Sequence, residues 1–471
     1  MVFSSTVFLF VFLPIVFLVT KLVKNIKFNN VFLTIVSLIF YAWGEPKYVF
    51  LMLAVVGINY IFGLLINYKN QYAKPILIAS VLSNLLILGY FKYMGFFVSN
   101  VNSILGNNRI AIPNIILPIG VSFFIFQAMS YTIDLYRKEI KVQKNPLYLA
   151  LYISFFPQLI AGPIVRYCDI EKQIEHRILT PEKTTLGIKR FVLGLSKKVI
   201  LANTFAVVVD TAFSWGMDTF GTFTTWLIMI LYASQIYFDF SGYSDMAIGM
   251  SKMFGFDFPE NFNFPYVSKS IQEFWRRWHI SLSTWFKEYL YIPLGGNRKG
   301  KTRTYINLII VFFCTGFWHG SSWNFVIWGL WHGLFIVIER LFLGKFLKNR
   351  KFSIVANIYA NLVVLVGWVF FRAETMGEAS KILQNMFTIV NGQYSALELA
   401  SPKVIFFMVV GIFFVGIHNF VFAKFSPKIN QGLLIGQKTG ITEMVYLFVL
   451  LAVCMVLVIS NTYNPFIYFR F

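Results

Sequence analysis

Histidine is the residue type best suited to acid–base chemistry here, and only five of the 471 residues are histidines. His319 ends an apolar run, 304–319, that carries no formal charge from Tyr305 onward. An imidazole in such surroundings is poorly solvated when charged, so its neutral form is favoured and can accept a proton. A neutral imidazole is the general base that an attacking hydroxyl requires. The alternative is a buried histidine that is hydrogen-bonded within a helix bundle.

A second histidine, His279, lies in a segment rich in tryptophan and arginine. At helical spacing Trp275, His279, Leu282 and Phe286 share a face, which predicts an amphipathic helix with the histidine on its apolar side. An interfacial helix anchored by tryptophan and arginine is the alternative interpretation. Forty residues separate the two histidines, about 60 Å along an unbroken helix. They can therefore meet only if the chain folds back.

The other three histidines carry weaker signals. His332 repeats the Trp-His-Gly triplet thirteen residues after His319, on a different helical face, which predicts packing or hydrogen bonding. His176 lies in a charged loop and is expected at the surface, and His418 lies near a helix end and is expected to be structural.

Two aspartates, Asp239 and Asp245, interrupt an apolar run and flank Tyr243. Such charges are costly in a membrane unless they are paired or face water. Arg276 and Arg277 are the nearest cations in sequence, and an ion pair and direct substrate contact remain equally open. The residues expected to contact substrate or line its path are Asp239, Tyr243, Asp245, Arg276, Arg277, Trp318 and Asn324.

Motifs for metals and nucleotides are missing from the sequence. It has no His-Glu-x-x-His pattern, no clustered cysteines and no carboxylate pair at ligand spacing, which predicts no metal and no bound cofactor. Gly295 to Arg298 holds too few glycines for a phosphate loop, and the three separated cysteines fit small apolar fillers.

Composition defines the elements that must position these residues. The chain is 57% hydrophobic and only 13% charged, whereas soluble domains contain about 25% charged residues. Apolar runs recur along most of it, which predicts an all-α polytopic membrane protein. The net charge of +21 (41 − 20) comes from short basic clusters between these runs. That pattern indicates cytoplasmic loops rather than nucleic-acid binding.

The apolar runs predict about twelve spans, with basic clusters on the cytoplasmic side and a single membrane domain over 1–471. We divide it into amino-terminal spans (1–150), a catalytic core (151–340) and carboxy-terminal spans (341–471). Phe155 to Pro163, with two prolines and a glycine, predicts a re-entrant segment. Runs 304–319 and 322–339 predict a hairpin with an outward tip. The other expected spans are 7–20, 29–43, 47–67, 75–98, 112–133, 199–214, 221–248, 354–371, 404–422 and 444–460.

Long motifs in fixed order resemble the membrane-bound O-acyltransferase family, and within it the alginate O-acetyltransferase branch. The likeness is strong over about 155–340 and weaker in Gly367 to Arg372. The motifs are Phe156 to Ile164, Tyr237 to Asp245, Pro259 to Tyr266, Phe274 to Leu294, and Gly316 to Gly333.

The resemblance implies a fold with re-entrant and interfacial helices around a central tunnel. It places the characteristic histidine on His319 and the second active-site histidine on His279. It also implies that acetyl groups from a cytoplasmic donor, acetyl-CoA or another, reach hydroxyls of an extracellular polysaccharide, often with an extracellular esterase-like acetyltransferase partner. The expected location is the bacterial cytoplasmic membrane, in contact with membrane lipid. We expect His319 to act as base and His279 to bind or activate the donor carbonyl by hydrogen bonding.

Two alternatives stay open. The nearer one is D-alanyl transfer to teichoic acid, which uses a similar pair of histidines. The more distant one is a transporter or flippase, although the repeated halves typical of transporters are not visible in the sequence.

Overall fold

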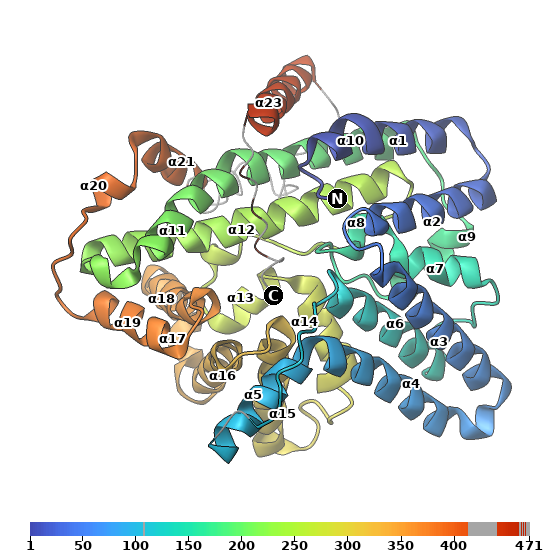
Figure 1. Cartoon of the computed structure of the whole chain (residues 1–471), viewed down its shortest axis with the longest axis horizontal. Helices are drawn as coiled ribbons and strands as arrows, with labels where there is room; N and C mark the ends of the chain where they lie inside the picture. The colour runs from blue at the N-terminus through green and yellow to red at the C-terminus, as the bar shows by residue number, and fades with distance from the viewer. Residues whose placement is uncertain (107–108, 413–439, 461–462, 464, 466, 468–471) are drawn as a thin grey trace. The chain divides into compact units, whose positions relative to one another are not determined.

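The computed structural model describes residues 1–106, 109–412, 440–460, 463, 465 and 467 (Figure 1). Over these residues the regular structure is helical, and pairing of strand type is limited to an isolated bridge between Phe220 and Tyr394. The all-α prediction is confirmed. The chain forms two compact units: unit 1 is Met1–Phe191 with Met246–Pro259, and unit 2 is Val192–Asp245 with Glu260–Phe471. Helices α10 (Pro181–Ser196) and α12 (Thr222–Met253) contribute to both units.

Six helical stretches in the described residues are long and apolar enough to cross a membrane, which confirms a polytopic membrane protein. The expected number of about twelve spans stays a prediction. The six are Tyr48–Tyr68, Ala73–Leu105, Pro181–Trp215, Trp323–Lys348, Arg350–Arg372 and Ile441–Ser460, and shorter apolar helices cover Phe8–Leu22, Ile26–Ala42 and Pro402–Gly411.

Unit 1 packs its helices around α6, whose side chains are almost all buried. Helices α3 and α4 both pack on α6 (Figure 1). Between them, Asn84 Nδ2 donates a hydrogen bond to Asn59 Oδ1 at 2.8 Å, the kind of polar contact that joins helices in lipid. The helices of unit 1 are α1 (Leu13–Leu22), α2 (Ile26–Ala42), α3 (Tyr48–Tyr68), α4 (Ala73–Leu88), α5 (Met94–Leu105), α6 (Val121–Tyr136), α7 (Pro146–Ser154), α8 (Phe156–Leu159) and α9 (Tyr167–Glu175).

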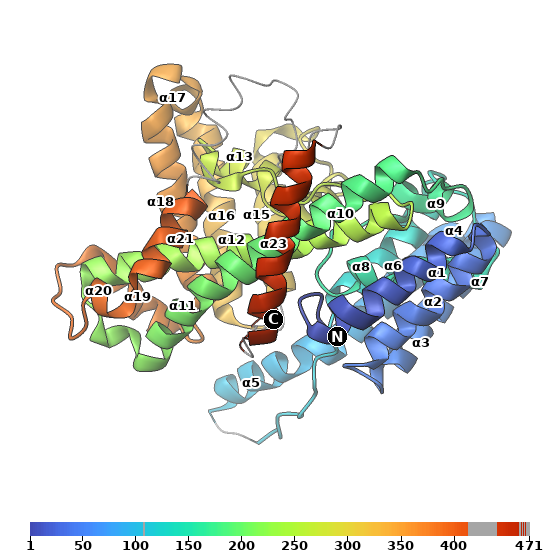
Figure 2. The same cartoon turned by 90° about the horizontal axis from the view of Figure 1, so that it is seen from above.

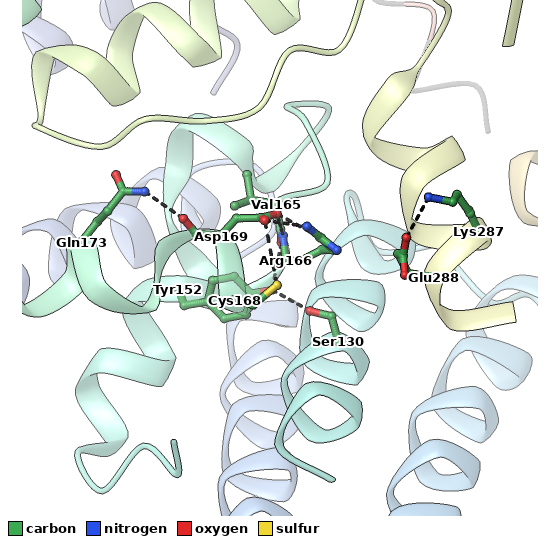
Figure 3. A network of polar contacts seen from close by, with 9 residues as sticks. All are labelled: Ser130, Tyr152, Val165, Arg166, Cys168, Asp169, Gln173, Lys287 and Glu288. Atoms are coloured by element: carbon green, nitrogen blue, oxygen red, sulfur yellow. Dashed lines mark hydrogen bonds and ion pairs between the residues drawn. The ribbon is translucent and has the colours of Figure 1, made fainter. Parts of the chain in front are cut away.

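The segment 155–163 is broken, as its prolines predict: α7 ends at Ser154, and α8 lasts only four residues. Polar contacts hold the chain around it. Arg166 forms an ion pair with Asp169 at 2.7 Å, and the hydroxyls of Ser130 and Tyr152 share a hydrogen bond at 2.9 Å (Figure 3). Whether this segment re-enters the membrane stays a prediction.

The expected span 112–133 is wrong in its first half, because helix α6 begins only at Val121. Two prolines precede the helix, and proline removes a backbone donor. Gly120 then adopts a left-handed conformation with φ of +76°, where a Cβ atom would lie 2.7 Å from the carbonyl oxygen of Leu159.

Unit 2 contains the predicted hairpin, formed by α15 (Gly300–His319) and α16 (Trp323–Ile338). Glycines let the two helices approach: a Cβ atom on Gly316 would lie 2.2 Å from the Phe325 carbonyl oxygen, and one on Gly329 would lie 2.2 Å from that of Phe312. Helix α18 packs along α16 (Figure 2). The other elements are a π-helix, η4 (Lys197–Ala202), and the helices α11 (Asn203–Trp215), α13 (Ile271–Arg277), α14 (Ile280–Phe286), α17 (Gly344–Lys348), α18 (Ser353–Arg372), α19 (Met376–Phe387), α20 (Ala396–Leu399), α21 (Pro402–Ile412) and α23 (Ile441–Ser460).

Candidate active site

The two candidate histidines lie side by side within unit 2. The centroids of the His279 and His319 rings are 6.3 Å apart. The two side chains are 0% and 2% exposed. The two imidazoles are thus close neighbours in one buried cluster.

His279 does not lie within a helix, which corrects the expected amphipathic helix. Helix α13 ends at Arg277 and α14 begins at Ile280, with His279 between them at φ +43° and ψ +54°. This left-handed conformation is costly for a residue with a Cβ atom. The apolar periodicity did identify the buried side chains, because Trp275, Leu282 and Phe286 are all buried.

Asn261, which the sequence analysis did not single out, holds His279 in place. Its side-chain oxygen lies 3.1 Å from His279 Nδ1 and accepts a hydrogen bond from Ser281 Oγ at 2.9 Å. Its Nδ2 donates to Ser244 Oγ at 2.9 Å. Its carbonyl oxygen accepts from the backbone N–H of Ile280 at 2.9 Å. The Asn261 side chain thus holds the His279 imidazole in place, and the Asn261 carbonyl group fixes the turn that follows His279.

This network assigns the tautomer of the neutral His279 ring. Because Asn261 Oδ1 can only accept, His279 Nδ1 carries the hydrogen and Nε2 keeps its lone pair. Burial lowers the pKa of His279 to about 3, so the ring is neutral at physiological pH. Nε2 is buried and has no hydrogen-bond partner among the residues described. His279 therefore offers a proton acceptor at Nε2.

His319 is the last residue of α15 and is surrounded by aromatic rings. Its ring centroid lies 4.9 Å from that of Trp318, 5.0 Å from Trp328 and 5.4 Å from Phe371. The Gly316–Gly329 approach brings α16 against α15 next to these residues. Close helix packing therefore positions His319.

His332 also packs against Trp328. Its ring is 5.3 Å from Trp328 and lies parallel to Phe274, with centroids 6.2 Å apart and an interplanar angle of 5°. Both ring nitrogens are buried without hydrogen-bond partners in the described part of the chain. The contacts are those of a packed ring, in line with the sequence interpretation.

A buried carboxylate, also missed from sequence, joins the segments that carry the two histidines. Glu339, directly after α16, accepts hydrogen bonds from the backbone N–H groups of Ile271 at 2.5 Å and Gln272 at 3.1 Å. These groups open α13, which leads to His279. Glu339 thereby fixes the start of α13 relative to the helix that packs on His319.

Asp239 and Asp245 are both paired, but not with the arginines suggested by sequence proximity. Asp239 pairs with Lys198 and Asp245 with Lys197, each at 2.6 Å. The expected partners were wrong because both lysines reach α12 from η4, about 45 residues away along the chain. Asp239 also accepts a hydrogen bond from the backbone N–H of Ile467 at 2.9 Å.

A model of the membrane-bound O-acyltransferase family matches residues 87–375, a range that includes both histidines. The chain belongs to this family.

Curated relatives support the assignment. The chain is 42% identical to the probable alginate O-acetylase AlgI of Pseudomonas putida, over the whole of both chains. It is 38% identical to the peptidoglycan O-acetyltransferase of Helicobacter pylori, over 82% of this chain and 80% of the relative. It is 31% identical to the teichoic acid D-alanyltransferase of Bacillus subtilis, over 54% of this chain and 66% of the relative. The protein is thus a multi-pass O-acyltransferase of a bacterial membrane.

The remaining predicted site residues of this acyltransferase occupy varied positions. Tyr243 is buried on α12, and Trp318 is buried beside His319. Asn324 Nδ2 donates to the Ala373 carbonyl at 2.6 Å, so this amide ties α16 to the end of α18. Arg277 pairs with Glu273 at 2.9 Å, whereas Arg276 is exposed. A substrate path lined by these residues, and a tunnel joining the histidines, stay predictions.

Two further predictions concern histidines away from the acyltransferase site. His176 is exposed, as expected, and His418 lies outside the described residues. One group of possible metal ligands occurs in the part of the chain that the structure describes: Asp134, Glu139 and Cys168, in unit 1. Such groups are common without a metal, and the expectation of a metal-free enzyme stays a prediction.

Proposed function

We propose that this acyltransferase moves acetyl groups from a cytoplasmic donor, acetyl-CoA or another, to hydroxyls of an extracellular polysaccharide. The observation that carries the proposal is the buried pair of imidazoles, His279 and His319, 6.3 Å apart within the family-matched region. The names of the relatives support the substrate class: alginate for one and peptidoglycan for another.

In this reaction the acceptor oxygen attacks the acetyl carbonyl carbon. A new ester bond forms, the bond to the donor's leaving group breaks, and the hydroxyl proton must reach that leaving group. A positioned base typically contributes 10²–10⁴-fold to such a step. Two neighbouring imidazoles can take up the proton and return it.

The hydrogen bonds of His279 favour a division of roles that differs from the one expected from sequence. With its hydrogen on Nδ1, directed at Asn261, a neutral His279 cannot donate from Nε2 to a carbonyl oxygen. We therefore propose that His279 Nε2 accepts the proton of the acceptor hydroxyl. His319 then polarises the acetyl carbonyl by hydrogen bonding, and the protonated His279 returns the proton to the leaving group as the bond to the donor breaks.

An extracellular esterase-like acetyltransferase completes the proposal. Acetyl groups delivered at the outer face would pass to the polymer directly or through this partner. The relatives' names support a polysaccharide acceptor, and the partner itself rests on the family resemblance.

The test uses a strain that lacks the gene and is complemented with wild-type protein, His319→Ala or the control His176→Ala. Alkali-released acetate from the extracellular polysaccharide measures transfer, and membrane blots measure protein level. We expect His319→Ala to lose transfer at unchanged protein level and the exposed His176 variant to keep it. Normal acetylation by His319→Ala would refute the proposed site.

D-alanyl transfer to teichoic acid is the second candidate, favoured by the relative from Bacillus subtilis. Mass spectrometry of the released acid separates the two, because acetate supports our proposal and alanine supports the alternative.

A further inference from the structure

Four lysine side chains line a hollow in unit 1. It has a volume of about 900 Å³ and lies where α3 ends and α4 begins, beside the chain that follows α6. A concave surface with charge of one sign concentrates ions of the other. Its polar lining consists of the amides Asn67 and Gln71, the hydroxyl of Tyr136, and the four lysines Lys74, Lys138, Lys141 and Lys144, with no carboxylate among the lining residues.

The protein does not neutralise these four charges. No ion pair or side-chain hydrogen bond joins any of the four ammonium groups to another residue in the described part of the chain. Two carboxylates near these lysines make other contacts: Glu139 pairs with Arg137 at 3.9 Å, and Glu171 accepts a hydrogen bond from the backbone N–H of Lys141 at 2.9 Å. Four like charges around one hollow repel one another, so an anion bound there would be stabilised.

The backbone at Lys138 is a second, independent sign. This residue follows α6 and has a φ of +62°. In the same turn its N–H donates a hydrogen bond to the Leu135 carbonyl, and the Glu139 N–H donates one to the Asp134 carbonyl. Helix ends of this type normally place glycine in the left-handed position. A side chain with a Cβ atom strains the backbone in this conformation. The Lys138 side chain is exposed, so packing does not explain the choice.

The position of the hollow indicates the source of the anion. It lies at the adjoining ends of the candidate spans Tyr48–Tyr68 and Ala73–Leu105, where lipid headgroups meet water. Basic pockets at such ends of helices suit phosphate-bearing headgroups. We propose that this hollow binds the phosphate groups of an anionic phospholipid, independently of the reaction at the histidines.

The experiment is native mass spectrometry of the purified full chain with phosphatidylglycerol, cardiolipin or phosphatidylcholine. The variant carries Lys74→Gln, Lys138→Gln, Lys141→Gln and Lys144→Gln, and a second variant carries arginine at the same four positions. The matched control carries Lys345→Gln, Lys348→Gln, Arg350→Gln and Lys351→Gln, four exposed bases at another helix end.

We expect the glutamine variant to bind anionic lipid at least about tenfold more weakly, since each base near a headgroup contributes about 1 kcal/mol. The arginine variant and the control should bind as the wild type does. Equal binding by the wild type and the glutamine variant, or equal binding of phosphatidylcholine and phosphatidylglycerol by the wild type, would overturn the proposal.

A competition arm identifies the source of the phosphate. Pyrophosphate and coenzyme A are added to lipid-loaded protein. Retention of the lipid supports a headgroup site. Lysine-dependent displacement of the lipid by either compound would overturn the lipid as occupant and leave a phosphate site for a soluble ligand.

Discussion

The two histidines of the active site are buried alike but are held in different ways. His279 lies in an irregular turn between two seven-residue helices, and hydrogen bonds to Asn261 fix its ring and the backbone of the next residue, Ile280. His319 ends a regular helix of twenty residues, and glycine contacts with α16 and surrounding aromatic rings fix it. Hydrogen bonds therefore fix the position of His279, and close packing fixes the position of His319.

This difference between the two histidines indicates which property of the enzyme depends on the surroundings of each. A hydrogen-bonded imidazole has a defined tautomer and a tunable pKa, which suits proton transfer. The ring contacts and helix packing described for His319 set its position. Changes at Asn261 should therefore alter how activity depends on pH, whereas changes at the glycines should alter whether the site forms.

The largest effect is expected from removing the His279 imidazole. His279→Asn keeps a residue that tolerates the left-handed backbone but cannot accept a proton. We expect acetyl transfer to fall by about 10²–10⁴-fold at normal protein level. His176→Asn, at an exposed position, is the control. Transfer within twofold of wild type would show that His279 is structural.

Packing at the hairpin is tested by Gly329→Ala. The added methyl group would lie 2.2 Å from the Phe312 carbonyl oxygen, so α15 and α16 must separate. Overpacking of this kind costs about 1–3 kcal/mol, which should lower the Tm in detergent and reduce activity. Gly89→Ala is the control, because a Cβ atom there would meet nothing within 4 Å. Equal Tm values for the two variants would contradict the role given to the glycine contact.

The tautomer assignment is tested by Asn261→Asp. A carboxylate beside Nδ1 favours the imidazolium and raises the pKa of His279 from about 3, by about one to three units. Proton uptake by His279 would then begin at a higher pH, so the acid limb of the activity profile should move upward. The other titratable or charged groups near this part of the chain are His319, Asp245, which pairs with Lys197, and Arg277, which pairs with Glu273.

Asn263→Asp supplies the control for that experiment, because it adds the same charge two residues away at an exposed position. If both variants shift the acid limb equally, a general charge effect accounts for the shift and the assignment fails.

The smallest effect is expected at Glu339, which links the two regions without reaching the rings. Glu339→Gln weakens the charge-assisted hydrogen bonds to Ile271 and Gln272, each worth about 1.5–3 kcal/mol. We expect a modest fall in kcat with little change in KM, because His279 is displaced while substrate contacts persist. Glu339→Asp should recover part of the lost kcat. An unchanged kcat in the Gln variant would exclude a positioning role for Glu339.

Sequence reasoning worked where the signal is local. The charge-free run before His319 predicted its helix, and Gly320 to Ser322 predicted the turn of the hairpin. It failed at His279, because apolar spacing reports which side chains are buried but not whether the backbone between them is helical. The partners of Asp239 and Asp245 were also missed, since both lysines come from a distant segment. Asn261 was visible in a motif, yet nothing in its sequence context indicated a contact with His279.

The π-helix η4 makes this part of the chain sensitive to insertions and deletions. Lys197 and Lys198, its first two residues, pair with aspartates that lie six positions apart on α12. A π-turn accommodates one more residue than an α-turn. Deleting one residue between 199 and 202 would therefore restore ordinary helix but rotate the following chain by about 100° relative to the lysines. The length of this turn, rather than its composition, is what an alignment of functional relatives should preserve.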